Sequence, residues 1–249
     1  MMEFSSKTAL VTGGSRGIGR AICLRLAEEG AAVAVNYQGN RAAAEEVCRL
    51  IGEAGGRAIP VQGNVADAEA VSAMVARTES ELGLIDLLVC NAGIGRLEGA
   101  DPHGIENWRH VMAVNMEGVF LPVMAVREGM SERGDGRIVC IASIAGLRPR
   151  ARNIAYATSK AAVIAFVRNI SGVLAPEIRI NAVAPGLIET EMIADMATDL
   201  KQRLIADTPI SRLGRPDEIA EMTLFLLSDK ASFTTGQTMV ASGGRVTVP

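Results

Sequence analysis

Aromatic residues, paired cysteines, long hydrophobic runs and an excess of positive charge are scarce or missing in this chain. Only 3% of its 249 residues are aromatic, and 25 Lys and Arg stand against 28 Asp and Glu, which leaves a net charge of -3. This slightly acidic balance argues against nucleic-acid binding, which favours a concentrated basic surface. No apolar run approaches the ~18 residues that suggest a membrane-spanning helix. We therefore expect neither a nucleic-acid nor a membrane partner.

The cysteines and the N-terminal residues indicate the cellular compartment in which the protein is expected. Cys23, Cys48, Cys90 and Cys140 lie far apart and form no Cys-x-x-Cys pair. A metal site or a disulfide framework is one interpretation, and four small hydrophobic residues in a reducing compartment is the other, which we favour. Residues 1–7 lack the basic segment and apolar stretch of a signal peptide. We expect a soluble cytoplasmic protein that holds no metal.

Hydrophobic residues, at 49%, are plentiful, and short β-branched runs alternate with helical stretches along the whole chain. This alternation predicts right-handed strand–helix–strand units and a sheet with helices on both faces. We expect an α/β fold: one doubly wound domain over residues 1–249 with a seven-stranded, mainly parallel sheet, a cofactor half of about 1–135 and a catalytic half of about 136–249. The predicted strands are Thr8–Thr12, Ala32–Asn36, Arg57–Val61, Leu84–Cys90, Arg137–Ala142, Ile178–Ala184 and Thr238–Ala241, and the predicted helices are Gly17–Glu29, Arg41–Ala54, Asp67–Leu82, Ile105–Glu132, Asn153–Leu174 and Pro216–Leu227.

A glycine-rich loop follows the first predicted strand and opens the first helix. Glycines let the backbone approach a pyrophosphate, and the free N–H groups at a helix start favour its negative charge. The spacing is G-x-x-x-G-x-G, and a glycine loop alone also fits a simple tight turn. Its place between strand and helix favours a dinucleotide site, to which we assign Gly13, Ser15, Arg16, Gly17, Ile18 and Gly19.

The second strand bears on the choice of nicotinamide cofactor. NAD-binding proteins of this class usually carry an acidic residue at its end to hold the ribose 2′-OH. Here the strand runs into Asn36 and Tyr37, and no acidic residue occurs from Ala31 to Ala44. Arg16 is placed to meet a 2′-phosphate instead, although it also fits a role as a solvated loop residue. We expect NADP(H) as the cofactor.

Three further post-strand segments carry candidate cofactor contacts. Each alone resembles an ordinary turn, but all of them follow strands whose carboxyl ends should meet at one edge of the sheet. The residues assigned are Asn64 and Val65 after the third strand, Asn91, Ala92 and Gly93 after the fourth, and Pro185, Gly186, Ile188 and Thr190 after the sixth.

The candidate chemistry lies after the fifth strand. Ser143 ends that strand, and Tyr156 and Lys160 stand four residues apart, so they share one helix face. A neighbouring ammonium favours tyrosinate and lowers the phenol pKa from its reference value near 10. A phenol tuned in this way is a good proton donor to a developing alkoxide. A Tyr-x-x-x-Lys pair is also common on surfaces, so its weight comes from the sheet context.

Together these motifs resemble the short-chain dehydrogenase/reductase family. The matching residues are Thr12-Gly13-x-x-x-Gly17-x-Gly19, Asn91-Ala92-Gly93, Asn115, Ser143, Tyr156-x-x-x-Lys160 and Pro185-Gly186. The resemblance implies a Rossmann fold and an NADPH-dependent carbonyl reductase. It assigns Tyr156 as the general acid, Lys160 as the residue that lowers its pKa and binds the nicotinamide ribose, Ser143 as the residue that orients the carbonyl, and Asn115 as the holder of a relay water.

Within the family the chain most resembles the 3-oxoacyl-[acyl-carrier-protein] reductases. This implies a 3-oxoacyl thioester as substrate, acyl carrier protein as a possible partner, a place in fatty acid biosynthesis and a homotetramer. Two alternatives stay open: the same chemistry on a sugar, steroid or secondary-metabolite carbonyl, and a non-catalytic NADP-binding scaffold. The chain departs from the branch at Asn64, where Asp is usual, and at Glu177, where Arg is frequent.

Three arginines without a family template stand between Ser143 and Tyr156. Arg148, Arg150 and Arg152 would lie beside the expected substrate mouth. One interpretation is recognition of a phosphate or carboxylate on the substrate. The other is a solvated loop. Met192 and Met196 fall in the segment that covers the substrate in relatives, where flexible methionines suit an adaptable apolar pocket as well as they suit core packing.

Overall fold

A computed structural model describes residues 2–96, 99–149, 153–191 and 196–247. It contains the strands β1 (Thr8–Val11), β2 (Ala32–Tyr37), β3 (Ala58–Gln62), β4 (Ile85–Cys90), β5 (Gly136–Ile141), β6 (Ile178–Pro185) and β7 (Thr238–Ala241). The helices are α1 (Gly17–Glu28), α2 (Arg41–Glu53), α3 (Ala68–Leu82), α4 (Ile105–Met112), α5 (Gly118–Arg133), α6 (Ile154–Leu174), α7 (Thr198–Ala206) and α8 (Pro216–Leu227).

The strands form one seven-stranded sheet in the order β3-β2-β1-β4-β5-β6-β7. All six pairings are parallel. The strand order reverses between β1 and β4, which is where a ligand binds in doubly wound folds. The predicted α/β doubly wound fold is therefore confirmed, and the sheet is more uniformly parallel than expected.

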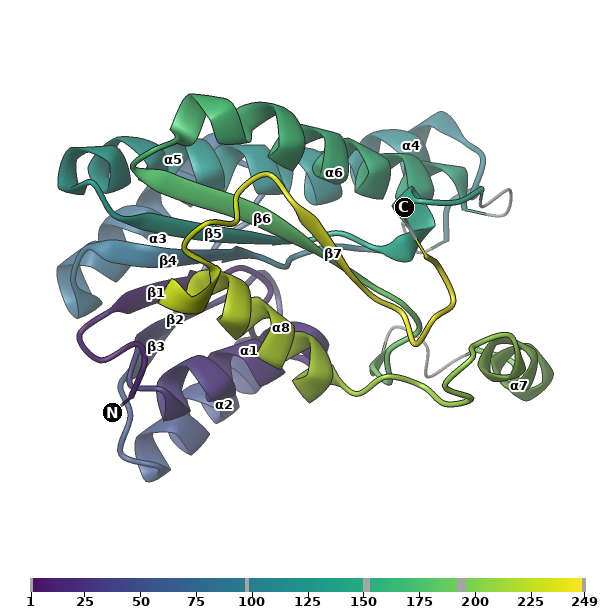
Figure 1. Cartoon of the computed structure of the whole chain (residues 1–249), viewed down its shortest axis with the longest axis horizontal. Coiled ribbons are helices and arrows are strands. Elements are labelled where there is room, and N and C mark those ends of the chain that lie inside the picture. Colours follow the sequence, from purple (N-terminus) through teal and green to yellow (C-terminus); the bar gives the residue numbers. More distant parts are fainter. Residues whose placement is uncertain (1, 97–98, 150–152, 192–195, 248–249) are drawn as a thin grey trace.

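Two hydrophobic clusters cover the two faces of the sheet (Figure 1). Because strand side chains alternate, Ala9 and Val11 face the cluster built with α1, α2 and α8, whereas Leu10 faces the cluster built with α3, α5 and α6. Burial on both sides explains why the central strands consist of continuous apolar residues.

Two helical predictions need correction. The predicted helix Ile105–Glu132 is interrupted by a π-helical segment, η1 (Ala113–Glu117), between α4 and α5. Hydrophobic periodicity does not reveal such a turn, because the apolar residues continue through it. Helix α7 is the other correction, because the sequence predicts no helix there; it is short, and none of its residues is buried.

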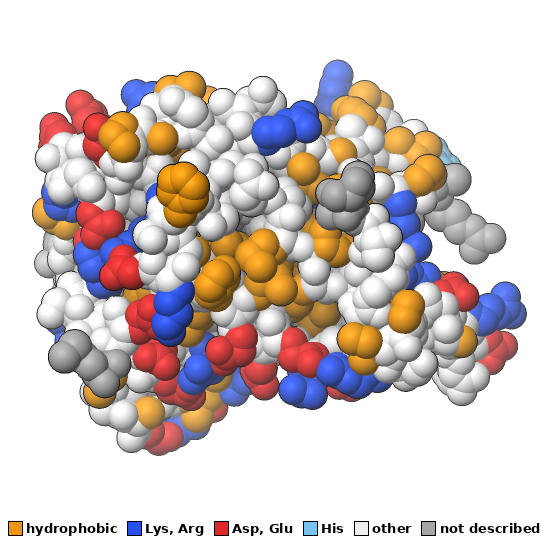
Figure 2. Space-filling model, in the orientation of Figure 1, with side chains coloured by type: hydrophobic (Ala, Val, Ile, Leu, Met, Phe, Trp, Pro, Cys, Tyr) orange, Lys and Arg blue, Asp and Glu red, His pale blue; other side chains and the backbone are white. Residues whose placement is uncertain are grey.

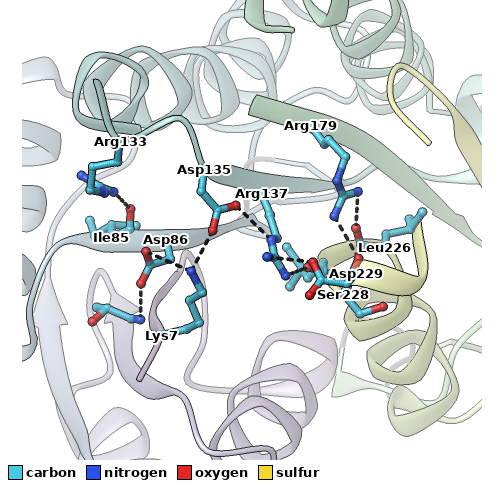
Figure 3. Close-up of polar contacts among 12 residues, drawn as sticks. Lys7, Ile85, Asp86, Arg133, Asp135, Arg137, Arg179, Leu226, Ser228 and Asp229 are labelled. Carbon is cyan, nitrogen blue, oxygen red and sulfur yellow. Dashed lines mark hydrogen bonds and ion pairs between the residues drawn. The ribbon is translucent and has the colours of Figure 1, made fainter. Parts of the chain in front are cut away.

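A polar network ties together the amino ends of the central strands (Figure 3). The Lys7 ammonium lies 2.8 Å from an Asp135 carboxylate oxygen and 3.6 Å from one of Asp86. Arg137, whose side chain is 12% exposed, contacts carboxylate oxygens of Asp135 at 3.3 Å and Asp229 at 3.0 Å. It also donates to the Leu227 carbonyl at 3.0 Å, so this edge is joined to the end of α8.

In the described part of the chain, no helix is long and apolar enough to cross a membrane. In the same part, His, Cys, Asp and Glu side chains form no group of three that could hold a metal ion.

Candidate active site

The predicted functional residues converge on the carboxyl edge of the sheet. The glycine loop follows β1, Asn91 follows β4, Ser143 follows β5 and Gly186 follows β6. Because all strands run in parallel, their carboxyl ends lie at one edge, opposite the network of Figure 3. The fold brings together segments that are more than 170 residues apart in sequence, as the contact between Arg16 and Glu191 shows.

The glycine loop is held in a shape that only backbone fits. A Cβ on Gly19 would lie 2.2 Å from the Gly13 carbonyl oxygen, and Gly13 has a φ of +62°, which favours glycine. The Asn91 side-chain amide donates to the carbonyls of Thr12 and Gly13, each at 3.0 Å. The loop therefore packs tightly on the β4 turn and opens α1 at Gly17. This cradle fits a pyrophosphate, which needs close backbone approach at a helix start.

Asn36 supports the same loop from the other side. Its Oδ1 accepts a hydrogen bond from the Gly13 N–H at 3.0 Å, while its Nδ2 donates to the carbonyls of Val61 at 3.2 Å and Gly63 at 3.1 Å. Asn36 and Tyr37 are buried. The Asn36 side chain is thus engaged with the protein and positions the loop. Direct cofactor contacts of Asn36 and Tyr37 remain predictions.

Asn64 and Val65, after β3, are placed by local contacts. Asn64 Oδ1 accepts from the Ala66 N–H at 3.1 Å. Val65 is buried against the start of α5, where a Cβ on Gly118 would lie 2.5 Å from a Val65 methyl group. The packing role of Gly118 was not predicted, because nothing distinguishes it in sequence from other helical glycines.

Lys160 is the most confined charged group of the site. It is 4% exposed, and its Nζ donates at 2.7 Å to the carbonyl of Ile141, two residues before Ser143. Its Nζ also lies 5.9 Å from the centroid of the Tyr156 ring. Burial lowers the pKa of Lys160 to about 8, and the neighbouring thiols of Cys140 and Cys90 act weakly in the opposite direction. The ammonium is therefore poised between charged and neutral forms just above neutral pH.

Ser143 and Tyr156 supply the two hydroxyl groups of the predicted site. Ser143 is 9% exposed and caps a short 3-10 turn, where its Oγ accepts from the Ala145 N–H at 3.1 Å. Accepting that bond leaves the Ser143 hydroxyl proton available to a ligand oxygen. Tyr156 lies in the first turn of α6 and is partly exposed. Together with Lys160, they supply a hydroxyl, a phenol and a buried cation from the turn after β5 and the first two turns of α6.

Asn115 lies in the π-helical segment and is fully buried. Its Oδ1 accepts from the Ile94 N–H at 2.8 Å, and its Nδ2 donates to the Ile94 carbonyl at 3.0 Å and to Ser159 Oγ at 2.9 Å. Ser159 Oγ donates in turn to the Tyr156 carbonyl at 2.8 Å. Asn115 thus connects the β4 turn to α6, and the π turn is what directs its side chain there. Its relay water remains a prediction.

The site is compact because its segments pack closely around Gly93, Ser159 and Thr12. A Cβ on Gly93 would lie 3.2 Å from Asn115 Oδ1 and 3.4 Å from Lys160 Nζ. The Thr12 hydroxyl accepts from the N–H groups of Asn91 at 2.9 Å and Ala92 at 3.1 Å. Thr12 belongs to the glycine motif but had no assigned role. The sequence predicts no role for Ser159, because only its position next to Lys160 distinguishes it.

The segment after β6 closes the site against the glycine loop. The Gly186 N–H donates to the Ala241 carbonyl at 2.8 Å, and the buried Ile188 forms a parallel bridge with Gly214. Beyond it, Thr190 is close enough that a Cβ on Gly17 would lie 3.3 Å from its methyl group. The structure therefore places the predicted residues of this segment beside the glycine loop.

The arginine loop is only partly described. Arg148 is partly buried, and its Nε atom is buried without a hydrogen-bond partner in the described part of the chain. Arg150, Arg152 and Met192 lie outside the described residues, and Met196 is partly buried. An unpaired guanidinium nitrogen is consistent with an anion site, and that role remains a prediction.

Comparison with known proteins agrees with this geometry. The family model described as "Enoyl-(Acyl carrier protein) reductase" matches residues 13–245. The acetoacetyl-CoA reductase of Rhizobium meliloti (strain 1021) is 40% identical over 242 residues, 96% of this chain and 98% of the relative. The 3-oxoacyl-[acyl-carrier-protein] reductase FabG of Staphylococcus aureus (strain Mu50 / ATCC 700699) is 40% identical over 240 residues with the same coverage. A solved 7α-hydroxysteroid dehydrogenase complexed with NADH and 7-oxo glycochenodeoxycholic acid has a TM-score of 0.92 at 34% identity, covering 98% of this chain and 95% of that chain.

Proposed function

Because the chain belongs to the short-chain dehydrogenase/reductase family of oxidoreductases, we propose that it reduces the carbonyl of a 3-oxoacyl thioester to a secondary alcohol with NADPH. The observation that carries this proposal is the buried Lys160 ammonium, which lies 5.9 Å from the centroid of the Tyr156 ring and donates to the Ile141 carbonyl, two residues before Ser143. When bound, the cofactor supplies a hydride to the carbonyl carbon.

The protein's own groups handle the substrate oxygen. The Ser143 hydroxyl donates a hydrogen bond to it and fixes its direction. The Tyr156 phenol then gives up its proton, so an O–H bond breaks on the tyrosine as one forms on the product alcohol. The Lys160 ammonium stabilises the resulting tyrosinate, which lowers the phenol pKa in the direction that proton donation requires. Asn115 is a positioning residue that holds α6 against the β4 turn.

Two features support NADPH as the partner. Arg16 projects from the glycine loop and is exposed, so it can approach a ligand at the loop surface. No acidic residue stands between Ala31 and Ala44, the region where an NAD-binding protein holds the ribose 2′-OH. A phosphate–guanidinium contact would add a charge-assisted hydrogen bond, which typically contributes about 1.5–3 kcal/mol.

The substrate class rests on the relatives. The two curated relatives at 40% identity are named as reductases of acetoacetyl-CoA and of a carrier-protein 3-oxoacyl ester. Both are 3-oxoacyl thioesters, which suggests that this chain accepts the same chemical group from CoA or from acyl carrier protein. We assign Arg148 as a contact for an anionic part of the carrier.

A steroid carbonyl is the second candidate substrate. The observation that favours it is the 0.92 TM-score to a dehydrogenase solved with NADH and a 7-oxo steroid. Substrate pockets in this fold are made from variable loops, so a shared framework does not decide between the two.

Assembly and location belong to the same proposal. Phe120 and Phe166 form an edge-to-face pair with ring centroids 5.9 Å apart, and Phe120 is 43% exposed, so α5 and α6 present an apolar face. Figure 2 shows a second apolar area near the middle of the visible face, over β7 and α8. These faces support a homotetramer, which we place in the cytoplasm. Light scattering at the mass of a monomer would overturn the tetramer.

The test of the reaction is oxidation of NADPH, followed at 340 nm, with acetoacetyl-CoA as substrate. We expect rapid turnover with the thioester, slower turnover with NADH and little with a neutral ketone. A 7-oxo bile acid is measured beside them. Turnover of the steroid without turnover of the thioester would move the assignment to the second candidate, and no turnover of any carbonyl would overturn the reductase itself.

A further inference from the structure

Arg16, the residue assigned to the cofactor phosphate, already has a carboxylate partner. Its Nη1 donates to a Glu191 carboxylate oxygen at 3.2 Å, across 175 positions of sequence. The two side chains are 70% and 69% exposed, so neither is locked by burial. Glu191 therefore competes for the Arg16 guanidinium with any anion that approaches the glycine loop.

The backbone on both sides of this pair is firmly held. On one side, Arg16 precedes the tightly packed start of α1. On the other, the Glu189 N–H donates to the Gly214 carbonyl at 2.9 Å, and the Gly214 N–H donates to the Leu187 carbonyl at 3.0 Å. Thr190 lies against Gly17, as the 3.3 Å approach shows. Glu191 is thus kept within reach of Arg16 whether or not the two side chains are in contact.

The surroundings of Glu191 carry a slight excess of acidic over basic side chains. Arg16 and Glu191 both line a surface hollow of about 790 Å³. Three basic side chains line it, from Arg16, Arg20 and Lys201, against four acidic ones, from Glu46, Glu189, Glu191 and Asp217. A dianionic phosphate bound to Arg16 would therefore have the Glu191 carboxylate close by and a local charge that does not favour it.

We propose that Glu191 is a cofactor-selectivity residue, which competes with the 2′-phosphate of NADPH for Arg16 and so limits the preference of this chain for NADPH over NADH. NADH has no such phosphate and meets no competition. The inference rests on the proposed function, because it takes Arg16 as the residue that meets the phosphate. By this proposal Arg16 strengthens the binding of NADPH, and Glu191 weakens it.

The test measures dissociation constants of NADPH and NADH by fluorescence titration, without substrate, for the wild type and three single variants. Glu191→Gln is expected to bind NADPH about two- to fivefold more tightly, the size expected for an exposed ion pair, with less than a twofold change for NADH. The gain should shrink as salt is raised, because exposed charges are screened. Arg16→Gln is expected to weaken NADPH binding selectively.

Glu189→Gln is the matched control. It removes the same charge from the same hollow, two residues away, and in the described ranges its carboxylate has no ion pair with Arg16. An equal gain in this variant would show a general charge effect and overturn the assignment to Glu191. Equal changes for NADPH and NADH in Glu191→Gln would overturn it as well.

The double variant Arg16→Gln/Glu191→Gln separates the two failures. If the competition is real, Glu191→Gln has no effect on NADPH once Arg16 is gone. If Arg16→Gln alone weakens NADPH but Glu191→Gln does nothing in either background, the inference fails and the NADPH assignment stands. If Arg16→Gln leaves the ratio of the two dissociation constants unchanged, the Arg16 assignment fails, and the inference fails with it.

Discussion

The two edges of the parallel sheet use buried and half-buried charges in opposite ways. At the amino edge, Arg137 is surrounded by two carboxylates and a carbonyl, and Lys7 lies between two carboxylates (Figure 3). At the carboxyl edge, the ammonium of Lys160 is more deeply buried, yet it donates to a single backbone carbonyl, that of Ile141, among the described residues. The Lys7 and Arg137 charges are paired with carboxylates, whereas the Lys160 charge has no carboxylate partner in the described part of the chain.

The difference follows from what each edge has to do. A charge that is fully paired contributes to stability but is not free to act on a ligand. A buried cation without a carboxylate costs folding free energy, because burial disfavours its charged form, but it stays available to a phenol that must lose a proton. We therefore expect changes at the carboxyl edge to affect turnover and pH dependence, and changes at the amino edge to affect stability alone.

The largest effect is expected from Tyr156→Phe. Removing the phenol hydroxyl removes the proton donor and should lower kcat for thioester reduction by about 10²–10⁴, the usual size of general acid catalysis. NADPH binding, measured by fluorescence, and the urea midpoint should change little. Retained turnover would place the proton donor elsewhere. An equally large loss of stability would show that this edge is structural after all.

The next effect concerns the pH dependence of stability. In the folded chain the pKa of Lys160 is about 8, against an ordinary value of 10.5. Between these values the unfolded chain holds a proton that the folded chain has lost, so the free energy of unfolding rises with pH. Relative to Lys160→Met, the wild type should gain about 2.5 kcal/mol from pH 7 to pH 10. A difference that stays flat with pH would contradict the lowered pKa of Lys160.

At the amino edge, Arg137→Met keeps the aliphatic volume and removes the charge. Losing contacts with Asp135, Asp229 and the Leu227 carbonyl should lower the free energy of unfolding by about 2 kcal/mol. The steady-state kcat should stay within about twofold of the wild type, since this edge does not contact the ligand. The matched control is Arg41→Met, which breaks the exposed pair with Glu45 and should lower the free energy of unfolding far less than Arg137→Met does.

The sequence predicts the carboxyl edge better than the amino edge. At the carboxyl edge, the close approach of a cofactor to the backbone favours glycine, and the proposed proton transfer favours Ser143 and the Tyr156–Lys160 spacing. These restrictions on residue type make the edge visible in the sequence. Lys7 and Arg137 look like ordinary surface charges, since nothing local shows that Lys7 lies beside Asp135 or that Arg137 meets Asp229. The π turn at Asn115 is hidden for a related reason: its Ile94 and Ser159 partners come from distant segments.

The smallest effect, and the finest probe of the amino edge, is Lys7→Met. Lys7 is partly exposed, and Asp86 still accepts the hydrogen bond from the Thr8 N–H, 2.9 Å in the wild type, after the change. The free energy of unfolding, measured in urea, should therefore fall by only about 0.5–1 kcal/mol. Burial raises the pKa of Asp135, but Lys7 and Arg137 outweigh it and leave that pKa below its usual value.

The sign of this shift fixes how the Lys7→Met difference depends on pH. A carboxyl with a lowered pKa stabilises the fold above its unfolded pKa near 3.9, and the contribution disappears as pH falls through the lower, folded value. The difference between wild type and Lys7→Met should therefore be full at pH 7 and shrink below about pH 4. If it instead persisted unchanged in acid, Lys7 would act through packing of its aliphatic stem, and the amino edge would depend on charge pairing less than Figure 3 indicates.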